Sequence, residues 1–225
     1  WFAPNGLKKV ADAETMKSPY LPHWTFDADT VTAYRGRRGE YYYVTVTDSE
    51  GRRRRERRTA WYPASGTVSR RFDDVLVVAT DRVPVKRLDA LDPWPLAQAR
   101  PYAAEFLAGH HTVRYSVEPE QGLEIAKGKM RKVIEQDCRR DIGGDEQRLD
   151  WVNTQYSNVA GKLVLLPVWS GSYLYNGKSW QVLINGCTGE VQGDRPYSAV
   201  KIAFAVLVAL IVVAAVIAVI RMNGG

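Results

Sequence analysis

Cysteine and histidine, which supply most structural zinc sites and many nucleophilic active sites, are scarce in this chain. Its two cysteines, Cys138 and Cys187, are too few for a disulfide framework, although one disulfide between them remains an alternative. Its three histidines are His23 and the adjacent pair His110 and His111. Neighbouring residues on a strand point to opposite faces, so this pair favours ordinary surface or core histidines over metal ligands. We therefore expect no metal site and no cofactor.

Motifs of the common enzyme classes are also missing. The sequence contains no phosphate-binding Gly-rich loop, no dinucleotide fingerprint and no paired zinc-ribbon cysteines. Ser65 lacks the glycines that stand two residues before and after the serine of a nucleophile elbow. The adjacent carboxylates Asp73 and Asp74 could form an active site with His110, but the sequence shows no matching nucleophile and base. We predict a non-enzymatic protein without catalytic residues and keep this enzyme hypothesis as the weakest alternative.

Positive charge is concentrated in one segment of the chain. Residues 35–58 hold nine arginines and no lysine against four acidic residues, so their net charge is +5, compared with +6 for the whole chain. Six of these arginines form the candidate contact surface: Arg52, Arg53, Arg54, Arg55, Arg57 and Arg58. Three interpretations compete, namely a solvated hairpin tip, a patch for anionic lipid headgroups and a contact for an acidic protein. Nucleic acid is a fourth and less favoured partner, although arginine binds phosphate and aromatic residues stand nearby.

The patterns of apolar and β-branched residues predict a fold that is mostly antiparallel sheet. Alternation is clearest over Tyr41–Thr47, where every second residue falls on the same face. Pro119 and apolar residues at three- and four-residue spacing predict one amphipathic helix over 119–140, which Gly143 ends. Further strands are expected at 23–34, 58–62, 75–79, 111–117, 163–169, 173–175, 178–184 and 190–192. A helix followed by a β-meander is typical of α+β folds.

The longest apolar run lies near the C-terminal end of the sequence. Ile202–Ile220 contains nineteen consecutive apolar residues, which as a helix would rise roughly 28 Å, close to the thickness of a bilayer's hydrocarbon core. Lys201 and Arg221 flank this run. The predicted fold is therefore α+β, with antiparallel sheets, one main amphipathic helix and a C-terminal transmembrane helix. Within that helix, the small side chains of Ala205 and Ala209 would form a packing stripe.

This interpretation divides the chain into four parts. They are an irregular segment at 1–23, an α+β head at 24–198 with two potential subdomains at 24–83 and 102–198, a transmembrane helix at 199–221, and a short tail at 222–225. More basic residues precede the apolar run than follow it, which favours a head on the cytoplasmic side of a bacterial inner membrane.

Several segments, taken in order, carry a resemblance to a known family. They are Leu21–Asp29, Arg35–Tyr42, Trp61–Gly66, Phe72–Val77, Arg140–Gln147, Thr154–Ser157, Leu166–Trp169 and Asn185–Val191. In combination they resemble a bacterial family of uncharacterised proteins that usually begins with a TFIIB-type zinc ribbon. Members often carry a primosomal-helicase label, which no motif of this chain supports. The ribbon is missing from these residues, so the resemblance implies no metal site here. By analogy with similar zinc-ribbon proteins that anchor phage-shock-type and SPFH scaffolds, it implies a role in protein binding at a membrane.

From these observations we predict a non-enzymatic, single-pass membrane protein whose head binds other proteins. It would act as an anchor or accessory subunit of a larger membrane complex, such as a respiratory or photosynthetic complex or a stress scaffold. The expected partners are the lipid bilayer and the other subunits of that complex. The alternative is a sensor that binds anionic lipid or nucleic acid through its Arg-rich hairpin.

Overall fold

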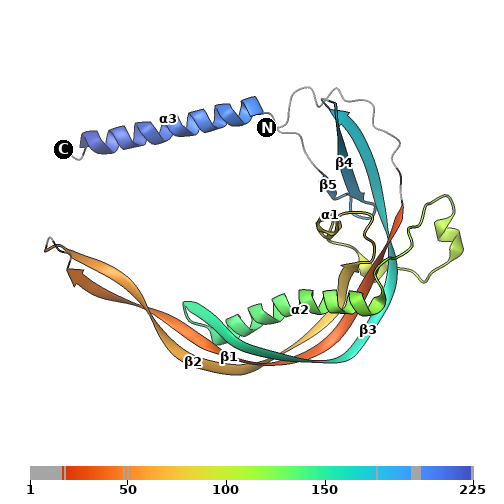
Figure 1. The fold of residues 1–225 in the computed structure, drawn as a ribbon, viewed down its shortest axis with the longest axis horizontal. Helices are drawn as coiled ribbons and strands as arrows, with labels where there is room; N and C mark the ends of the chain where they lie inside the picture. Colours follow the sequence, from red (N-terminus) through yellow and green to blue (C-terminus); the bar gives the residue numbers. More distant parts are fainter. Residues whose placement is uncertain are drawn as a thin grey trace.

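The computed structural model describes residues 17, 19–47, 49, 51–175, 177–193 and 199–223. Within these residues, one antiparallel sheet of five strands has the order β2-β1-β3-β4-β5 (Figure 1). The strands are β1 (Tyr20–Thr47), β2 (Arg53–Val78), β3 (Glu146–Tyr175), β4 (Lys178–Asn185) and β5 (Val191–Gly193). The helices are α1 (Val85–Asp89), η2 (Leu96–Gln98), η3 (Ala104–Leu107), α2 (Pro119–Ile142) and α3 (Ala199–Asn223). The described chain is mostly antiparallel sheet with few helices.

β1 and β2 form a long hairpin that extends beyond the rest of the sheet. The two strands pair from His23 opposite Val78 to Thr47 opposite Arg53. β3, on the other side of β1, pairs with it only as far as Gly39. Residues 40–47 and 53–60 are therefore a two-stranded projection, which we name the arm (Figure 1).

The sheet bends where β1 meets extra residues on both of its neighbours. The register of β1 shifts by one residue against β2 at Asp27 and against β3 at Ala28. The extra residues include Asp74 and Asn158, whose φ angles of 53° and 51° lie in the left-handed region. Because a β-bulge bends its strand and increases the local twist, two bulges at one level curve the sheet around α2 (Figure 1).

α2 packs into the concave face of this curved sheet (Figure 1). Pro119 stands in the first turn of α2, where backbone N–H groups have no partner within the helix, so its missing N–H costs no hydrogen bond. Gly143, with φ of 66°, ends the helix. Its buried residues recur every four positions: Gly122, Ala126, Met130, Ile134, Cys138 and Ile142. They pack against buried sheet residues that include Phe26, Tyr34 and Phe72. This cluster is the main apolar core.

A second buried cluster lies on the other side of the bend, where α1 and the loop after it cover the sheet. Its members are Leu21, Val78, Leu88, Leu91, Trp94, Leu166, Val168 and Leu183. The Asn185 amide nitrogen donates to the carbonyl oxygens of Leu91 at 2.9 Å and Pro93 at 3.3 Å. Its Oδ1 accepts from the backbone N–H groups of Cys187 and Thr188. A single buried side chain thus joins the loop to the turn after β4.

The predicted transmembrane helix needs correction. Among the described residues, no helix is both long and apolar enough to cross a membrane. The finding contradicts the predicted span at 199–221, the single-pass membrane anchor and the inner-membrane location.

The roles predicted for residues of that span stay predictions. Ala205 is half-buried and Ala209 is exposed. Lys201 belongs to the first turn of α3, and the side chain of Arg221 lies outside the described residues. The domain boundaries at 24–198 and its subdomains stay predictions.

One local feature also differs from the sequence-based expectations, and one open alternative is decided. His111–Val117 was expected to be a strand but makes only an isolated bridge, between Thr112 and Tyr20. The Ser116 N–H bonds instead to the carbonyl oxygen of Ala79, so the segment crosses the end of the hairpin. Both cysteines are free, one buried and the other exposed, which excludes the disulfide alternative.

Candidate binding surface

The arginines of the predicted contact run occupy the start of β2 rather than the turn before it. Arg52 precedes the strand, which begins at Arg53, and the side chains of all six arginines are exposed. Side chains alternate along a strand, so the run divides between two faces. One face carries Arg53, Arg55 and Arg57, and the other carries Arg54 and Arg58.

The face with Arg53, Arg55 and Arg57 continues the outer face of the sheet. In β1, even-numbered residues from Ala28 to Gly36 are buried on the side of α2, whereas most odd-numbered residues between them are more exposed. The register places Arg57 opposite Tyr43, so the two side chains share the odd-numbered face. We name this outer face, opposite α2, the open face.

Two arginines on the open face of the arm stack on tyrosine rings. The guanidinium carbon of Arg55 lies 4.4 Å from the centre of the Tyr43 ring, and that of Arg57 lies 4.2 Å from the centre of the Tyr41 ring. Each arginine reaches diagonally across the hairpin, past the residue directly opposite it. An exposed cation–π pair contributes about 0.5–1 kcal/mol, which is enough to favour one side-chain position.

The same pattern continues from the arm onto the body of the sheet. Arg148 covers the Trp61 ring at 4.0 Å, and Arg35 lies 5.5 Å from the Trp151 ring. Trp61 and Arg148 belong to strands on either side of β1, and Gly39 stands between them. A Cβ at Gly39 would lie 3.0 Å from the Trp61 ring, so glycine leaves room for this contact. We name these four pairs the Arg–aromatic row.

Acidic side chains are interleaved with the arginines of the arm. Glu56 lies 3.3 Å from Nε of Arg58 on the face opposite the row. On the open face, the Tyr41 hydroxyl donates to Oε1 of Glu146 at 2.9 Å, and this hydrogen bond raises the pKa of Tyr41. The arm therefore presents an excess of arginine within a mixed-charge pattern.

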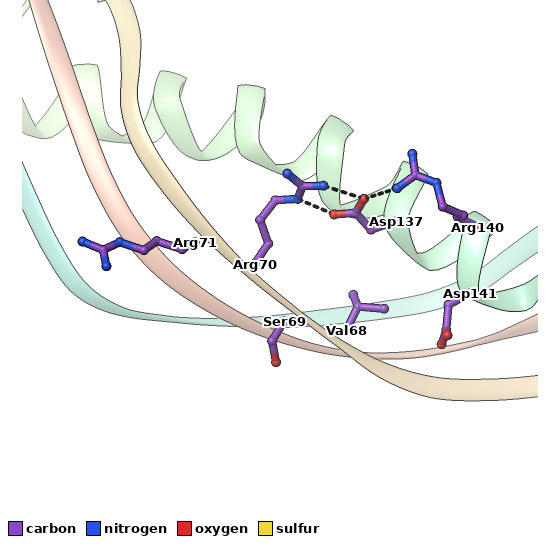
Figure 2. Close-up of a pocket in the computed structure, with 7 residues that line it drawn as sticks. All are labelled: Val68, Ser69, Arg70, Arg71, Asp137, Arg140 and Asp141. Carbon is purple, nitrogen blue, oxygen red and sulfur yellow. Dashed lines mark hydrogen bonds and ion pairs between the residues drawn. The ribbon is translucent and has the colours of Figure 1, made fainter. Parts of the chain in front are cut away.

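A pocket of about 650 Å³ lies between α2 and the outer edge of β2 (Figure 2). Its lining residues are Val68, Ser69, Arg70, Arg71, Asp137, Arg140 and Asp141. Arg70 donates two hydrogen bonds to Asp137, one of them 2.8 Å long, and Arg140 donates a third at 3.1 Å. The bonds from Arg70, which make the largest contribution, hold the pKa of Asp137 below its usual range. Asp141 accepts a 2.6 Å hydrogen bond from the Tyr34 hydroxyl.

The pocket keeps an excess of positive charge after these contacts are made. Both of its carboxylates already accept hydrogen bonds from the protein. Arg71 points away from Asp137 along the sheet, and no ion pair is found for it within the described part of the chain (Figure 2). Arginine thus predominates at this edge of β2, as it does on the arm.

The residues of the enzyme hypothesis do not form one site. Asp73 and Asp74 gather with Asp27 at the bulge, with ligand oxygens within 4.8 Å of one another. The Lys162 ammonium lies 3.3 Å from Asp74 and 3.7 Å from Asp27, so a cation of the protein already occupies this acidic cluster. His110 packs edge-on against another aromatic ring, at 5.2 Å between ring centres. The structure therefore brings the carboxylates together, but next to a lysine.

Comparison with known proteins finds one relative of similar sequence. The chain is 24% identical over 212 residues to the uncharacterized protein YdjG of Bacillus subtilis (strain 168). The matched region is 90% of this chain and 58% of that relative, so the chain spans little more than half of the relative's length. No family model matches the chain, and no solved structure matches it. The resemblance to the zinc-ribbon family stays a prediction.

The sequence indicated only part of the open face. The arginine run and the aromatic residues at 41–43 and 61–62 were recognised as neighbours, but Arg35, Arg148 and Trp151 were not included. Glu146–Asp150 is rich in charge and follows two glycines, so it has the composition of a loop. Arg148 and Trp151 lie on the open face because their strand pairs with β1. A single sequence does not show that pairing, so it could not assign these two residues to the face.

Proposed function

We propose that this chain is a non-enzymatic binding protein whose arm docks on an acidic surface of another protein. The observation that carries the proposal is the stacking of Arg55 on Tyr43 and of Arg57 on Tyr41. A stacked guanidinium keeps the N–H groups at its edge available, in the fork that matches a carboxylate. Arginine and tyrosine are also enriched among the residues that dominate the energy of protein interfaces.

The stacking also lowers the entropy that binding must remove. A long arginine side chain loses about 0.5–1.5 kcal/mol of rotamer freedom when an interface immobilises it. Arg55 and Arg57 are already held over rings by cation–π contacts, so part of this loss occurs on folding. The two-stranded arm carries them beyond the body of the sheet, where a partner can reach both (Figure 1).

The mixed charge of the arm favours a protein over a lipid surface. A membrane rich in anionic lipid is uniformly negative, so it would repel Glu56 and Glu146, which stand among the arginines. A protein surface can place basic side chains opposite these two carboxylates and acidic ones opposite the arginines.

The covered rings make nucleic acid the weaker fit. Proteins that bind single strands use exposed aromatic faces, on which the bases stack. In the arm, the rings of Tyr41 and Tyr43 are each covered on one face by an arginine. A base would have to displace the guanidinium before it could stack on that face.

Binding of three anionic probes to the full chain tests this proposal. The probes are poly-L-glutamate, a single-stranded oligodeoxythymidylate and phosphatidylglycerol vesicles, compared at equal negative charge and physiological ionic strength. We expect poly-L-glutamate to bind most tightly, with an affinity that falls as salt rises. Tighter binding to the oligonucleotide or to the vesicles would overturn the proposal in favour of that class of partner.

Two double variants distinguish binding through the open face from binding that depends only on the total charge of the arm. Arg55→Gln/Arg57→Gln removes two charges from the stacked pairs, and Arg54→Gln/Arg58→Gln removes two from the opposite face. We expect the first pair to weaken poly-L-glutamate binding about tenfold or more and the second about twofold. Equal losses would mean that only the total charge of the arm matters, and the open face would lose its assigned role.

A further inference from the structure

Over Thr59–Ser69, no other strand among the described residues pairs with the outer edge of β2. β2 stands first in the strand order and pairs only with β1. Natural proteins usually protect such edges with charged side chains or proline, and Thr59–Ser69 contains no charged residue and one proline, Pro63. After Pro63, β2 presents backbone N–H and C=O groups that another strand could bind.

Two residues, Pro63 and Arg70, show which backbone groups of β2 point outward. Proline has no N–H, and in a paired strand its nitrogen faces the side without a partner, so Pro63 marks an outward position. The carbonyl of Arg70 accepts a 2.9 Å hydrogen bond from Oγ1 of Thr30 on β1, so Arg70 marks an inward one. The register with β1 is unbroken between them, which assigns outward N–H groups to the odd-numbered residues Ser65, Thr67, Ser69 and Arg71.

The pocket described above lies beside these outward groups. Ser69 and Arg71 both line it, and α2 forms its opposite wall through Asp137 and Arg140 (Figure 2). A strand edge next to a helix is an arrangement that binds extended peptides by strand addition. Alternate side chains of an added strand would point toward α2, and one of them would reach Arg140.

Charge decides what kind of strand fits this edge. A second copy of β2, paired antiparallel about Ala64, would set Arg57 against Arg71 and Arg58 against Arg70, and like charges directly opposite each other are destabilising. A strand with acidic residues at both ends and an uncharged middle would instead match the edge along its length. We propose that the outer edge of β2 binds an extended acidic segment of the partner protein by strand addition, with an acidic side chain in the pocket.

This inference rests on the proposed function and specifies how the acidic partner binds. A suitable probe is a synthetic peptide with two glutamates at each end of a stretch of alternating threonine, serine and valine that is as long as Thr59–Ser69. A peptide with lysine in place of every glutamate is the matched control.

Amide hydrogen exchange, measured by NMR on the full chain, reports strand addition directly. Between Pro63 and the bulge, the even-numbered amides of β2 face β1, so we expect them to exchange slowly without the peptide. We expect the acidic peptide to slow exchange at Ser65, Thr67, Ser69 and Arg71, and the lysine peptide to have no such effect. Peptide binding that leaves these four amides unprotected would overturn the inference.

A backbone variant provides a second measurement. Thr67→Pro removes an outward N–H without removing a bond to β1, and Thr67→Val changes the side chain but keeps the N–H. We expect Thr67→Pro to weaken peptide binding about tenfold and Thr67→Val to leave it within about twofold. If Thr67→Pro does not fold, the exchange measurement on the natural chain still decides.

The two proposals fail in different ways. Loss of peptide binding in Arg55→Gln/Arg57→Gln together with unchanged binding in Thr67→Pro would retain the arm as the contact and reject strand addition. Unchanged peptide binding in both variants would reject both proposals. Loss in both variants, together with protection of the outward amides, supports both.

Discussion

The hydroxyl of Tyr34 donates a 2.6 Å hydrogen bond to Oδ2 of Asp141, and this bond joins the centre of β1 to the last turn of α2. Burial of the ring and the bond to Asp141 together raise the pKa of Tyr34 to about 12. Gly66, opposite Tyr34 on β2, leaves the space for it, since a Cβ there would lie 2.7 Å from the hydroxyl oxygen. Three elements therefore meet at one hydrogen bond.

We expect Gly66→Ala to break this bond and to lower the free energy of unfolding by about 1–2 kcal/mol. The added methyl would also lie 2.8 Å from Asp141 Oδ2, so neither partner could keep its place. Gly128→Ala is the control because nothing lies within 4 Å of a Cβ on this exposed helix position. It should instead raise the free energy of unfolding by about 0.5–1 kcal/mol. Urea unfolding measures both, and equal stabilities would contradict the argument.

The bridge from Arg70 to Asp137 should make stability depend on acid. The pKa of Asp137 is lower in the folded than in the unfolded chain, so its contribution is complete above the unfolded value of about 4. That contribution is lost as pH falls through the folded pKa. Because Arg70 is 38% exposed, we expect Asp137→Asn to remove only about 1 kcal/mol at neutral pH.

Urea unfolding between neutral pH and pH of about 3 measures this effect. Asp150→Asn is the matched control, since its ion pair with Arg37 is 48% exposed on both sides and should contribute almost nothing. An Asp137→Asn chain with the same acid sensitivity as the natural chain would show that the bridge adds no stability.

His23 should destabilise the fold in mild acid. Its ring is buried, and burial lowers its pKa from 6.5 to about 4. Between these two values the unfolded chain binds a proton that the folded chain does not, so the free energy of unfolding falls as pH decreases, by on the order of 3 kcal/mol in total.

Replacement of His23 by asparagine should remove this dependence. An asparagine amide can replace Nδ1, which contacts the carbonyl oxygen of Leu21 at 3.0 Å, but it does not titrate. His111→Gln, at an exposed position, should keep the slope of the natural chain. Urea unfolding from pH 7 to pH of about 4 makes the comparison, and an unchanged slope in His23→Asn would assign the effect to other groups.

Asn185 should control the order of the loop that follows α1. Its amide donates to Leu91 and Pro93, so we expect Asn185→Ala to lower the free energy of unfolding by about 2–4 kcal/mol. Asn185→Asp keeps an acceptor for Cys187 but loses the donors, so it should destabilise the chain as well. Limited proteolysis should then cut between residues 84 and 101 faster than in the natural chain, and unchanged cleavage would contradict this role.

The sequence predicted elements whose signals are local. Alternation over Tyr41–Thr47 indicated a strand, and Pro119 with apolar residues at three- and four-residue spacing indicated α2. Gly177, between the strands expected at 173–175 and 178–184, has φ of 71°, the left-handed backbone that a two-residue hairpin turn requires. In each case the responsible residues lie within a few positions of the element that they specify.

The sequence did not predict which distant strands pair or which side chains from distant segments come into contact. β3 begins at Glu146, in a charged stretch that forms a strand because β1 pairs with it. The lysine that occupies the Asp27 and Asp74 cluster comes from a distant part of the chain. The apolar run Ile202–Ile220 predicted a membrane span, whereas no helix among the described residues is long and apolar enough to cross a membrane.

Because side chains alternate between the two faces of the arm, the register of its strands decides which side chains a partner meets. A one-residue slip in the pairing of the arm's two strands would leave composition and net charge unchanged, yet it would move every side chain of one strand to the other face. Arg54, Glu56 and Arg58 would then replace the stacked arginines beside Tyr41 and Tyr43. The register of the arm thus decides which of two chemically unequal surfaces the partner meets.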